Sequence, residues 1–184
     1  SVDGCYFNSR MIGDYVYTVI AQPAYYVKGE VHLPSICSGD HVEEIDASAI
    51  YYSDVPDYSY GFTTILAVNV QNDEEEPTHK TFLLGAAHCM YVSLNNIYIT
   101  LPQGESTLIY RYHIEGSEIM CVADGEVQGH VLNQFSMDEH EGYFRIATTK
   151  GDVTWGLGEA ASQNHVYVLD MNLDVVGRLE NLAS

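Results

Sequence analysis

The feature of this sequence that most constrains its fold is a group of four short strands that recurs three times. Each predicted strand is rich in β-branched and aromatic residues and is bounded by Gly, Asn, Asp or Pro. A tight turn precedes the second strand of every group, at residues 13–14, 95–96 and 141–142. Four antiparallel strands repeated at roughly 45 residues is the period of a β-propeller blade. The sequence therefore predicts an all-β fold of propeller-type four-stranded antiparallel blades, about three of them in an open arc.

The predicted blades make the 184 residues a single partial propeller domain. Blade 1 takes about residues 5–86, blade 2 about 88–128 and blade 3 about 130–181, and an insertion at 22–61 interrupts blade 1. The predicted strands are 6–12, 15–21, 63–70 and 79–84, then 90–94, 97–101, 107–114 and 118–127, then 131–137, 143–149, 165–169 and 175–179. A lipocalin-like barrel or a sandwich could use the same strands and stays the alternative, although neither requires the repeated grouping.

Charge and hydropathy exclude several classes of partner. Asp and Glu number 26 against 7 Lys and Arg, so the formal net charge is -19. A surface this negative repels phosphate backbones and anionic lipid, which argues against a nucleic-acid partner. No run of about twenty apolar residues occurs, so we expect no transmembrane segment in this chain.

Two consecutive stretches of blade 3 resemble a known family. Val-Leu-Asn-Gln-Phe-Ser-Met-Asp-Glu at 131–139 and Gly-Tyr-Phe-Arg-Ile-Ala-Thr-Thr at 142–149 look like the hallmark of a secreted archaeal and bacterial β-propeller family, distantly related to WD-40 propellers. Residues 164–179, 9–17 and 90–98 are also similar to it. Members of that family carry a much longer propeller domain, so this chain resembles an internal piece of about three blades. The resemblance implies a secreted or cell-surface protein, mainly of archaea, and brings no catalytic residues.

An open arc of blades has a physical consequence for function. A propeller closes with four or more blades, so three leave apolar end faces, which rarely stay bare in soluble monomers. We therefore expect a protein partner, self-association through the open faces, or rearranged strands. The leading prediction is a non-enzymatic extracellular or cell-surface interaction module. A self-assembling structural subunit of a cell-envelope layer or filament is the alternative, and part of a secreted enzyme with its active site outside this chain is a further one.

No catalytic constellation is visible in the sequence. It contains no G-x-S-x-G elbow, no P-loop and no H-E-x-x-H motif, so we predict that the chain is not an enzyme. Residues 138–141, Asp-Glu-His-Glu, are the densest cluster of potential metal ligands, and we interpret them as a solvated hairpin tip.

One segment suggests a cofactor, Ca2+. Asp170, Asn172 and Asp174 offer oxygen ligands at positions one, three and five of a calcium loop. No Gly follows at position six and no Glu stands at position twelve. The same residue types also suit a tight hairpin between two strands.

The insertion in blade 1 carries tyrosines interleaved with aspartates, and one helical turn is expected within it at residues 46–50. Tyrosine is an amphipathic anchor at recognition surfaces, so this set predicts a sugar-binding or protein-binding surface. The alternative is that these rings pack the insertion onto the blades. The candidate ligand-binding residues are Tyr25, Tyr26, Tyr51, Tyr52, Tyr58 and Tyr60.

Four cysteines without a C-x-x-C pair indicate either two disulfides in an oxidising compartment or four buried thiols. The sequence leaves three pairings open. The predicted bridges are Cys89–Cys121 within blade 2 and Cys5–Cys37 from the first strand to the insertion.

Overall fold

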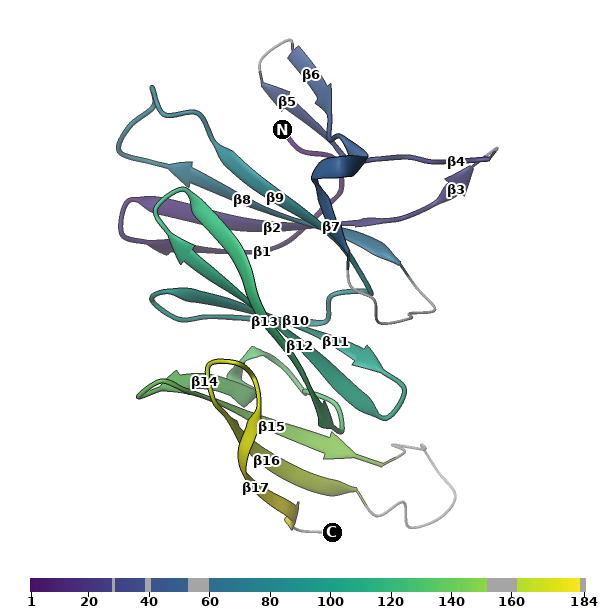
Figure 1. The fold of residues 1–184 in the computed structure, drawn as a ribbon, viewed down its shortest axis with the longest axis vertical. Helices are drawn as coiled ribbons and strands as arrows, with labels where there is room; N and C mark the ends of the chain where they lie inside the picture. Colours follow the sequence, from purple (N-terminus) through teal and green to yellow (C-terminus); the bar gives the residue numbers. More distant parts are fainter. Residues whose placement is uncertain (28, 39–40, 53–59, 152–161, 183–184) are drawn as a thin grey trace. The chain divides into compact units, whose positions relative to one another are not determined.

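The computed structural model describes residues 1–27, 29–38, 41–52, 60–151 and 162–182. Strands dominate these residues, and two short 3-10 helices accompany them, η1 (Ala47–Ala49) and η2 (Gln134–Ser136). The chain divides into two compact units. Figure 1 labels the strands of both. Unit 1 contains residues 1–87 and 114–119, and unit 2 contains residues 88–113 and 120–184.

Unit 1 is built on a five-stranded sheet. In spatial order its strands are β1 (Cys5–Ile12), β2 (Tyr15–Pro23), β8 (Gly61–Asn69), β9 (Thr78–Leu84) and β7 (Ile50–Tyr52). The first four form the antiparallel meander predicted for blade 1. The fifth, β7, comes from the insertion and runs parallel to β9, which the sequence pattern did not predict.

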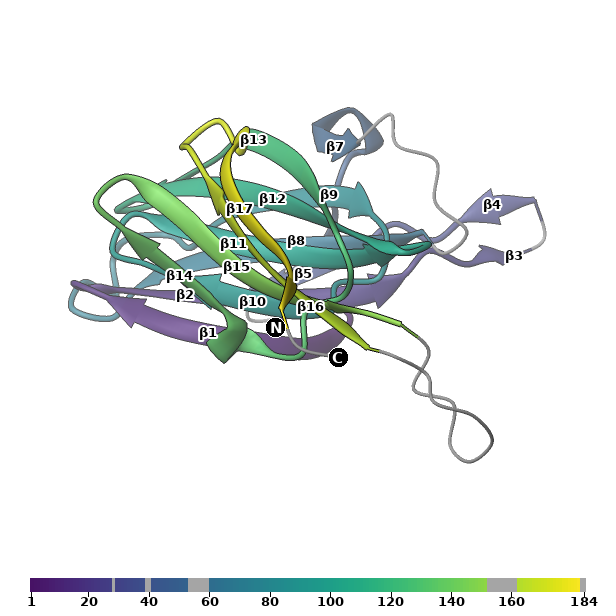
Figure 2. The same cartoon turned by 90° about the horizontal axis from the view of Figure 1, so that it is seen from below.

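The rest of the described insertion forms two hairpins. One pairs β3 (Tyr26–Val27) with β4 (Glu30–Val31), and the other pairs β5 (Ser35–Ser38) with β6 (His41–Glu44). Both views show the β3–β4 hairpin extending away from the five-stranded sheet (Figure 1 and Figure 2). The helical turn predicted at residues 46–50 is confirmed as η1, and the Asp46 side chain caps it by accepting the Ser48 N–H.

Side chains point alternately to the two sides of the sheet along β2 and β8, so the sheet of unit 1 has two different faces. Val19 and Ile65 are paired, completely buried and define the first face. On this face the Tyr17 hydroxyl donates a hydrogen bond to the Gly116 carbonyl at 2.7 Å. Ile20 and Leu66, one residue further along each strand, point to the opposite, second face and are only half-buried. The second face is therefore the one left for the insertion to cover.

Unit 2 holds two four-stranded antiparallel sheets, which confirm the predicted propeller-type blades. Blade 2 consists of β10 (Cys89–Val92), β11 (Asn96–Gln103), β12 (Ser106–Glu115) and β13 (Glu118–Gln128), although the tip of its β12–β13 hairpin belongs to unit 1. Blade 3 consists of β14 (Met137–His140), β15 (Tyr143–Lys150), β16 (Gln163–Leu169) and β17 (Val175–Leu182).

The first strand of blade 3 begins later than predicted. The expected strand at 131–137 is wrong, because η2 occupies much of that range and β14 starts at Met137. The Asn133 side chain accepts the Phe135 N–H at 2.9 Å, and the Asn133 carbonyl accepts the Ser136 N–H at 3.1 Å. An asparagine side chain that accepts a hydrogen bond from the backbone N–H two residues later competes in this way with strand pairing.

Side chains from both sheets of unit 2 form one hydrophobic core. The rings of Tyr98 and Phe144 are both completely buried and stack with their centroids 4.1 Å apart. The turn between β16 and β17 adds Leu173, which has a left-handed backbone with φ of 64°. A Cβ on Gly125 of β13 would lie 2.7 Å from the Leu173 carbonyl oxygen. The close approach of the β16–β17 turn to β13 therefore requires glycine at position 125. The two blades of unit 2 are thus packed as neighbours.

Candidate binding site on the first blade

Five of the six candidate tyrosines lie among the described residues, and all five are in unit 1. Their exposed fractions run from 47% for Tyr60 to 75% for Tyr26. We call Tyr25, Tyr26, Tyr51, Tyr52 and Tyr60 the tyrosine surface. Tyr58 lies outside the described residues. Such exposure favours the predicted recognition role over the alternative, in which the rings would be covered by packing.

Strand register gathers these tyrosines at one end of the five-stranded sheet. Tyr52 pairs with Leu83, which pairs with Phe62 on β8. Tyr60 lies two residues before Phe62, and its carbonyl accepts the Ala24 N–H at 3.1 Å. Tyr25 and Tyr26 follow Ala24 directly, and Tyr26 begins the β3–β4 hairpin. Tyr52, Tyr60 and the segment of Tyr25 and Tyr26 therefore lie near the end of the sheet where β2 ends and β8 begins. Tyr51 and Tyr52 point to opposite faces of β7.

Tyr51 is held in place although its ring is half-exposed. Its ring centroid lies 5.6 Å from that of Phe82. The Lys80 ammonium lies 5.4 Å from the same ring, within the distance of a cation–π interaction. A ring oriented in this way loses little side-chain entropy on binding, which is the property of an anchor residue.

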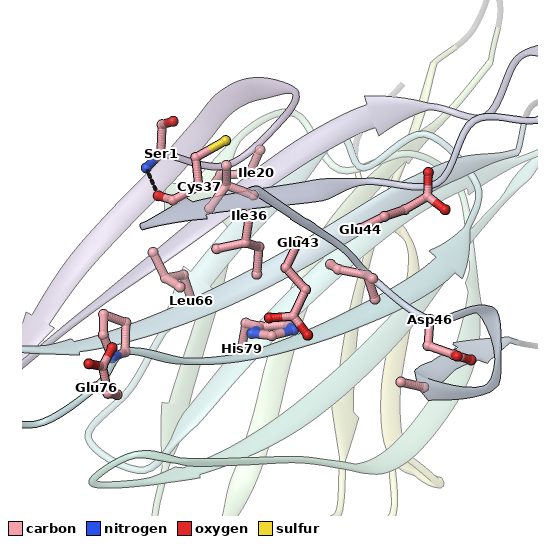
Figure 3. A pocket seen from close by; sticks show the side chains of 14 residues that line it. Ser1, Ile20, Ile36, Cys37, Glu43, Glu44, Asp46, Leu66, Glu76 and His79 are labelled. Atoms are coloured by element: carbon pink, nitrogen blue, oxygen red, sulfur yellow. Dashed lines mark hydrogen bonds between the residues drawn. The ribbon is translucent and has the colours of Figure 1, made fainter. Parts of the chain in front are cut away.

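A second feature of unit 1, which the sequence did not predict, is a cavity of about 710 Å³ on the second face of the sheet. Its floor is apolar, with Ile20 and Leu66 from the sheet and Ile36 from β5 (Figure 3). Hairpin β5–β6 is fixed there by an isolated β-bridge between Val2 and Ile36. The insertion thus covers part of the face and leaves a hollow beside it. We call this hollow the blade 1 pocket.

Carboxylates surround the blade 1 pocket. They belong to Glu43 and Glu44 of β6, Asp46 before η1 and Glu76 before β9. Figure 3 shows the Glu43 carboxylate beside the imidazole of His79. Desolvation lowers the pKa of His79, and the charge of Glu43 opposes this shift. The imidazole is therefore mostly neutral at pH 7, and the pocket keeps its negative charge.

Two of the pocket carboxylates differ in their surroundings. Asp46 accepts hydrogen bonds from the Ser48 hydroxyl at 2.6 Å and the Ser48 N–H at 2.7 Å, which lower the pKa of its carboxyl group. Glu76 lies at the other side, next to Pro77. Among the ion pairs formed by the described residues, none involves a carboxylate of the pocket. Sequence reasoning missed this site because residues 43 and 76 are far apart in the chain.

In unit 2 the interpretation of residues 138–141 as a solvated tip is wrong for Glu139. Its Oε2 accepts hydrogen bonds from the Tyr98 hydroxyl at 2.6 Å, Asn96 Nδ2 at 2.9 Å and Ser93 Oγ at 2.9 Å. Its backbone N–H donates to the Tyr91 hydroxyl at 3.1 Å. Burial, together with the bond to Glu139, raises the pKa of Tyr98, so the phenol stays a donor. This carboxylate ties β14 to blade 2 and is structural.

The three residues proposed for calcium form the tight turn between β16 and β17. One carboxylate oxygen of Asp170 accepts the N–H groups of Asn172 at 2.8 Å and Asp174 at 3.1 Å. The Asp170 N–H donates to the Asp174 carbonyl at 3.0 Å. In the described part of the chain no three His, Cys, Asp or Glu side chains come close enough to hold a metal ion. The calcium site stays a prediction, and the hairpin interpretation accounts for the same residues.

Neither predicted disulfide is present, since all four cysteines are free thiols. Cys89 and Cys121 lie on β10 and β13, the opposite edge strands of blade 2. Three strand spacings of about 4.8 Å separate them by about 14 Å, twice the Cα distance that a disulfide spans. The Cys5–Cys37 pair is also unbonded. Cys37 lies opposite Ser1, whose nitrogen donates to the Cys37 carbonyl at 2.6 Å (Figure 3). Residues 1–3 run antiparallel to 35–37, with the Asp3 N–H donating to the Ser35 carbonyl, so the chain leads away from Cys37 before it reaches Cys5.

Alkylation without reductant tests this arrangement. In denaturant we expect four alkylated cysteines per chain by mass spectrometry, because the fold brings no two of the thiols together. In the native protein we expect Cys89 to react slowly, since burial raises the pKa of its thiol and hides it. Cys5 is exposed and serves as the internal control. If the mass measured in denaturant shows two cysteines that did not react, those two form a disulfide and the free-thiol arrangement is wrong.

The comparisons with known proteins agree with this architecture. All of residues 1–184 match the family model described as beta propeller domain. The chain belongs to this β-propeller family. The propeller domain is 44% identical over 78 residues to an uncharacterised protein, MJ1554, of Methanocaldococcus jannaschii, covering 42% of this chain and 12% of that protein. It is 40% identical over 74 residues to an uncharacterised protein of Archaeoglobus fulgidus, covering 39% of this chain and 10% of that protein.

These matches confirm the family predicted from blade 3 and show archaeal relatives. The propeller domain aligns with about a tenth of the length of each of the two relatives. Among the described residues, no helix of the propeller domain has the length and hydropathy needed to cross a membrane.

Proposed function

We propose that this propeller domain is a non-enzymatic interaction module of a secreted or cell-surface protein, and that it binds its partner through the insertion in the first blade. The observation that carries the proposal is the tyrosine surface, five exposed rings on the insertion of the first blade. Exposed aromatic patches mark interaction sites, and tyrosine is enriched among the residues that dominate binding energy. The extracellular location is supported by the family resemblance and by a net charge of -19, which suits cation-rich surroundings.

A double substitution of Tyr51→Ala and Tyr52→Ala tests the proposal. We expect the wild-type protein to co-sediment with cell-envelope fragments of its source organism and the double variant to bind at least tenfold more weakly. The reason is that two aromatic anchors are lost, and tenfold corresponds to about 1.4 kcal/mol. The measurement is the bound fraction as a function of envelope concentration.

The matched control is Tyr143→Ala, which removes a half-exposed tyrosine of unit 2. This variant should co-sediment as the wild type does. The melting temperature of the double variant should stay within about 2 °C of the wild type, because exposed side chains contribute little to stability. A drop of several degrees, or an equal loss of binding in the control, would assign the tyrosines to packing and contradict the proposal.

The second candidate function is a self-assembling structural subunit of a cell-envelope layer or filament. The outer strand β17 favours it, because in the described sheet order this strand has a neighbour only on one side. Its Leu179 is 61% exposed, and Val175 and Val176 are exposed beside it. An open apolar edge of this kind promotes pairing with another chain. Light scattering distinguishes the two candidate functions, because a self-assembling subunit forms larger species as the protein concentration rises.

A further inference from the structure

We infer that the blade 1 pocket is a docking site for an extended, basic peptide segment of a partner protein. The pocket shares no lining residue with the tyrosine surface, so this inference goes beyond the proposed function. Its volume of about 710 Å³ lies within the range of about 300–1,000 Å³ that is typical of ligand sites.

The chemistry of the pocket matches lysine and arginine side chains. Ile20, Ile36 and Leu66 form an apolar floor, and carboxylates stand at the rim (Figure 3). Lysine and arginine have an aliphatic stem that packs on apolar surface and a charged head that stays at the edge. A basic segment would therefore bury its stems on the floor and place its charges at Glu43 and Glu76.

Charge complementarity decides whether the segment that binds is positively or negatively charged. The described residues form no ion pair that uses a carboxylate of the pocket. Lys80 is close in sequence, but it pairs with Ile65 on the first face and lies over the Tyr51 ring. It therefore does not neutralise the pocket, which is on the second face. The net charge of -19 also attracts a basic segment from a distance and repels an acidic one.

The strand next to the pocket favours an extended occupant. In the described residues β6 pairs with β5 alone, as a two-stranded sheet, so its other edge has no strand partner. An extended peptide can add to such an edge by backbone hydrogen bonds, with alternate side chains directed into adjoining pockets. Glu43 lies on β6 itself, so an added strand would carry its basic residues past this carboxylate.

Fluorescence anisotropy with a defined probe tests the inference. The probe is a fluorescein-labelled ten-residue peptide that alternates valine with lysine, titrated with the full chain at 50 mM salt. We expect saturable binding, at least tenfold weaker binding by the double variant Glu43→Gln/Glu76→Gln, and no binding of a peptide with glutamate in place of lysine. The matched control is Asp124→Asn/Glu126→Gln on β13, which changes the net charge equally at residues that do not line the pocket.

Each outcome is decisive. An equal loss in both double variants would show general electrostatic attraction, and absence of saturable binding would show that the pocket takes no basic peptide; either result overturns the inference. Raising the salt to 1 M should weaken binding, because the screening length falls from about 10 Å at 0.1 M to about 3 Å. The Tyr51→Ala/Tyr52→Ala variant should bind the peptide like the wild type. The proposed function, tested with envelope fragments, can therefore fail separately from this one.

Discussion

Replacing Phe144 with alanine is expected to destabilise unit 2 by about 3–5 kcal/mol. The ring is completely buried and stacks on Tyr98 at 4.1 Å, with the Tyr91 ring at 6.4 Å. Removing it leaves a cavity between two rigid sheets, which cannot close by small movements. Urea unfolding followed by circular dichroism measures the change, and hydrogen exchange should show lost protection in β10 to β17.

Phe135→Ala is the matched control for this prediction. Phe135 belongs to the same blade but is 86% exposed, so its removal should change the free energy of unfolding by no more than about 0.5 kcal/mol. If both variants unfold at the same urea concentration, the core shared by blades 2 and 3 is not the source of the stability of unit 2. Because the chain has two compact units, exchange data are needed to assign each transition to a unit.

Replacing Glu139 with alanine is expected to cost about 2–3 kcal/mol. The substitution removes the single oxygen that accepts hydrogen bonds from Tyr98, Asn96 and Ser93. Tyr98 and Asn96 are buried, and a buried donor without a partner loses its hydrogen bond to water as well. The free energy of unfolding measured in urea at pH 7 gives the size of the effect.

Two further variants make the result specific. Glu139→Gln keeps an acceptor oxygen without the charge and should recover part of the loss. Glu126→Ala removes an exposed glutamate from a strand of unit 2 and should change stability by no more than about 0.5 kcal/mol. If Glu139→Ala is as mild as Glu126→Ala, the carboxylate is solvated, as its acidic neighbours in the sequence suggested.

The blades themselves were predictable because their signals are local. Alternation of side chains has a period of two residues in a strand, and a tight turn needs particular residue types. Residues 141–142 illustrate this: Glu141 and Gly142 have φ of 51° and 77° and join β14 to β15. The short turn η1 was predictable for the same reason, since Asp46 caps it within three residues.

One short strand was not predicted, and one predicted strand began later than expected. Strand β7 has only three residues, which is too few to show alternation, and it exists because β9 offers it an edge. The start of blade 3 moved because the Asn133 side chain bonds the following backbone and forms η2. In both cases hydrogen bonds, rather than hydropathy, decided the secondary structure.

The amino-acid pattern alone thus determined the class of fold, the three sheets and the tyrosine-rich insertion. Only tertiary structure decided which distant side chains meet: Glu43 with Glu76 at one pocket, Glu139 with Tyr98 in one core, and no cysteine with another. The physical reason is that strand periodicity specifies which face a side chain occupies. The order of strands in a sheet and the packing of sheets depend on contacts between segments far apart in the chain, which no local pattern records.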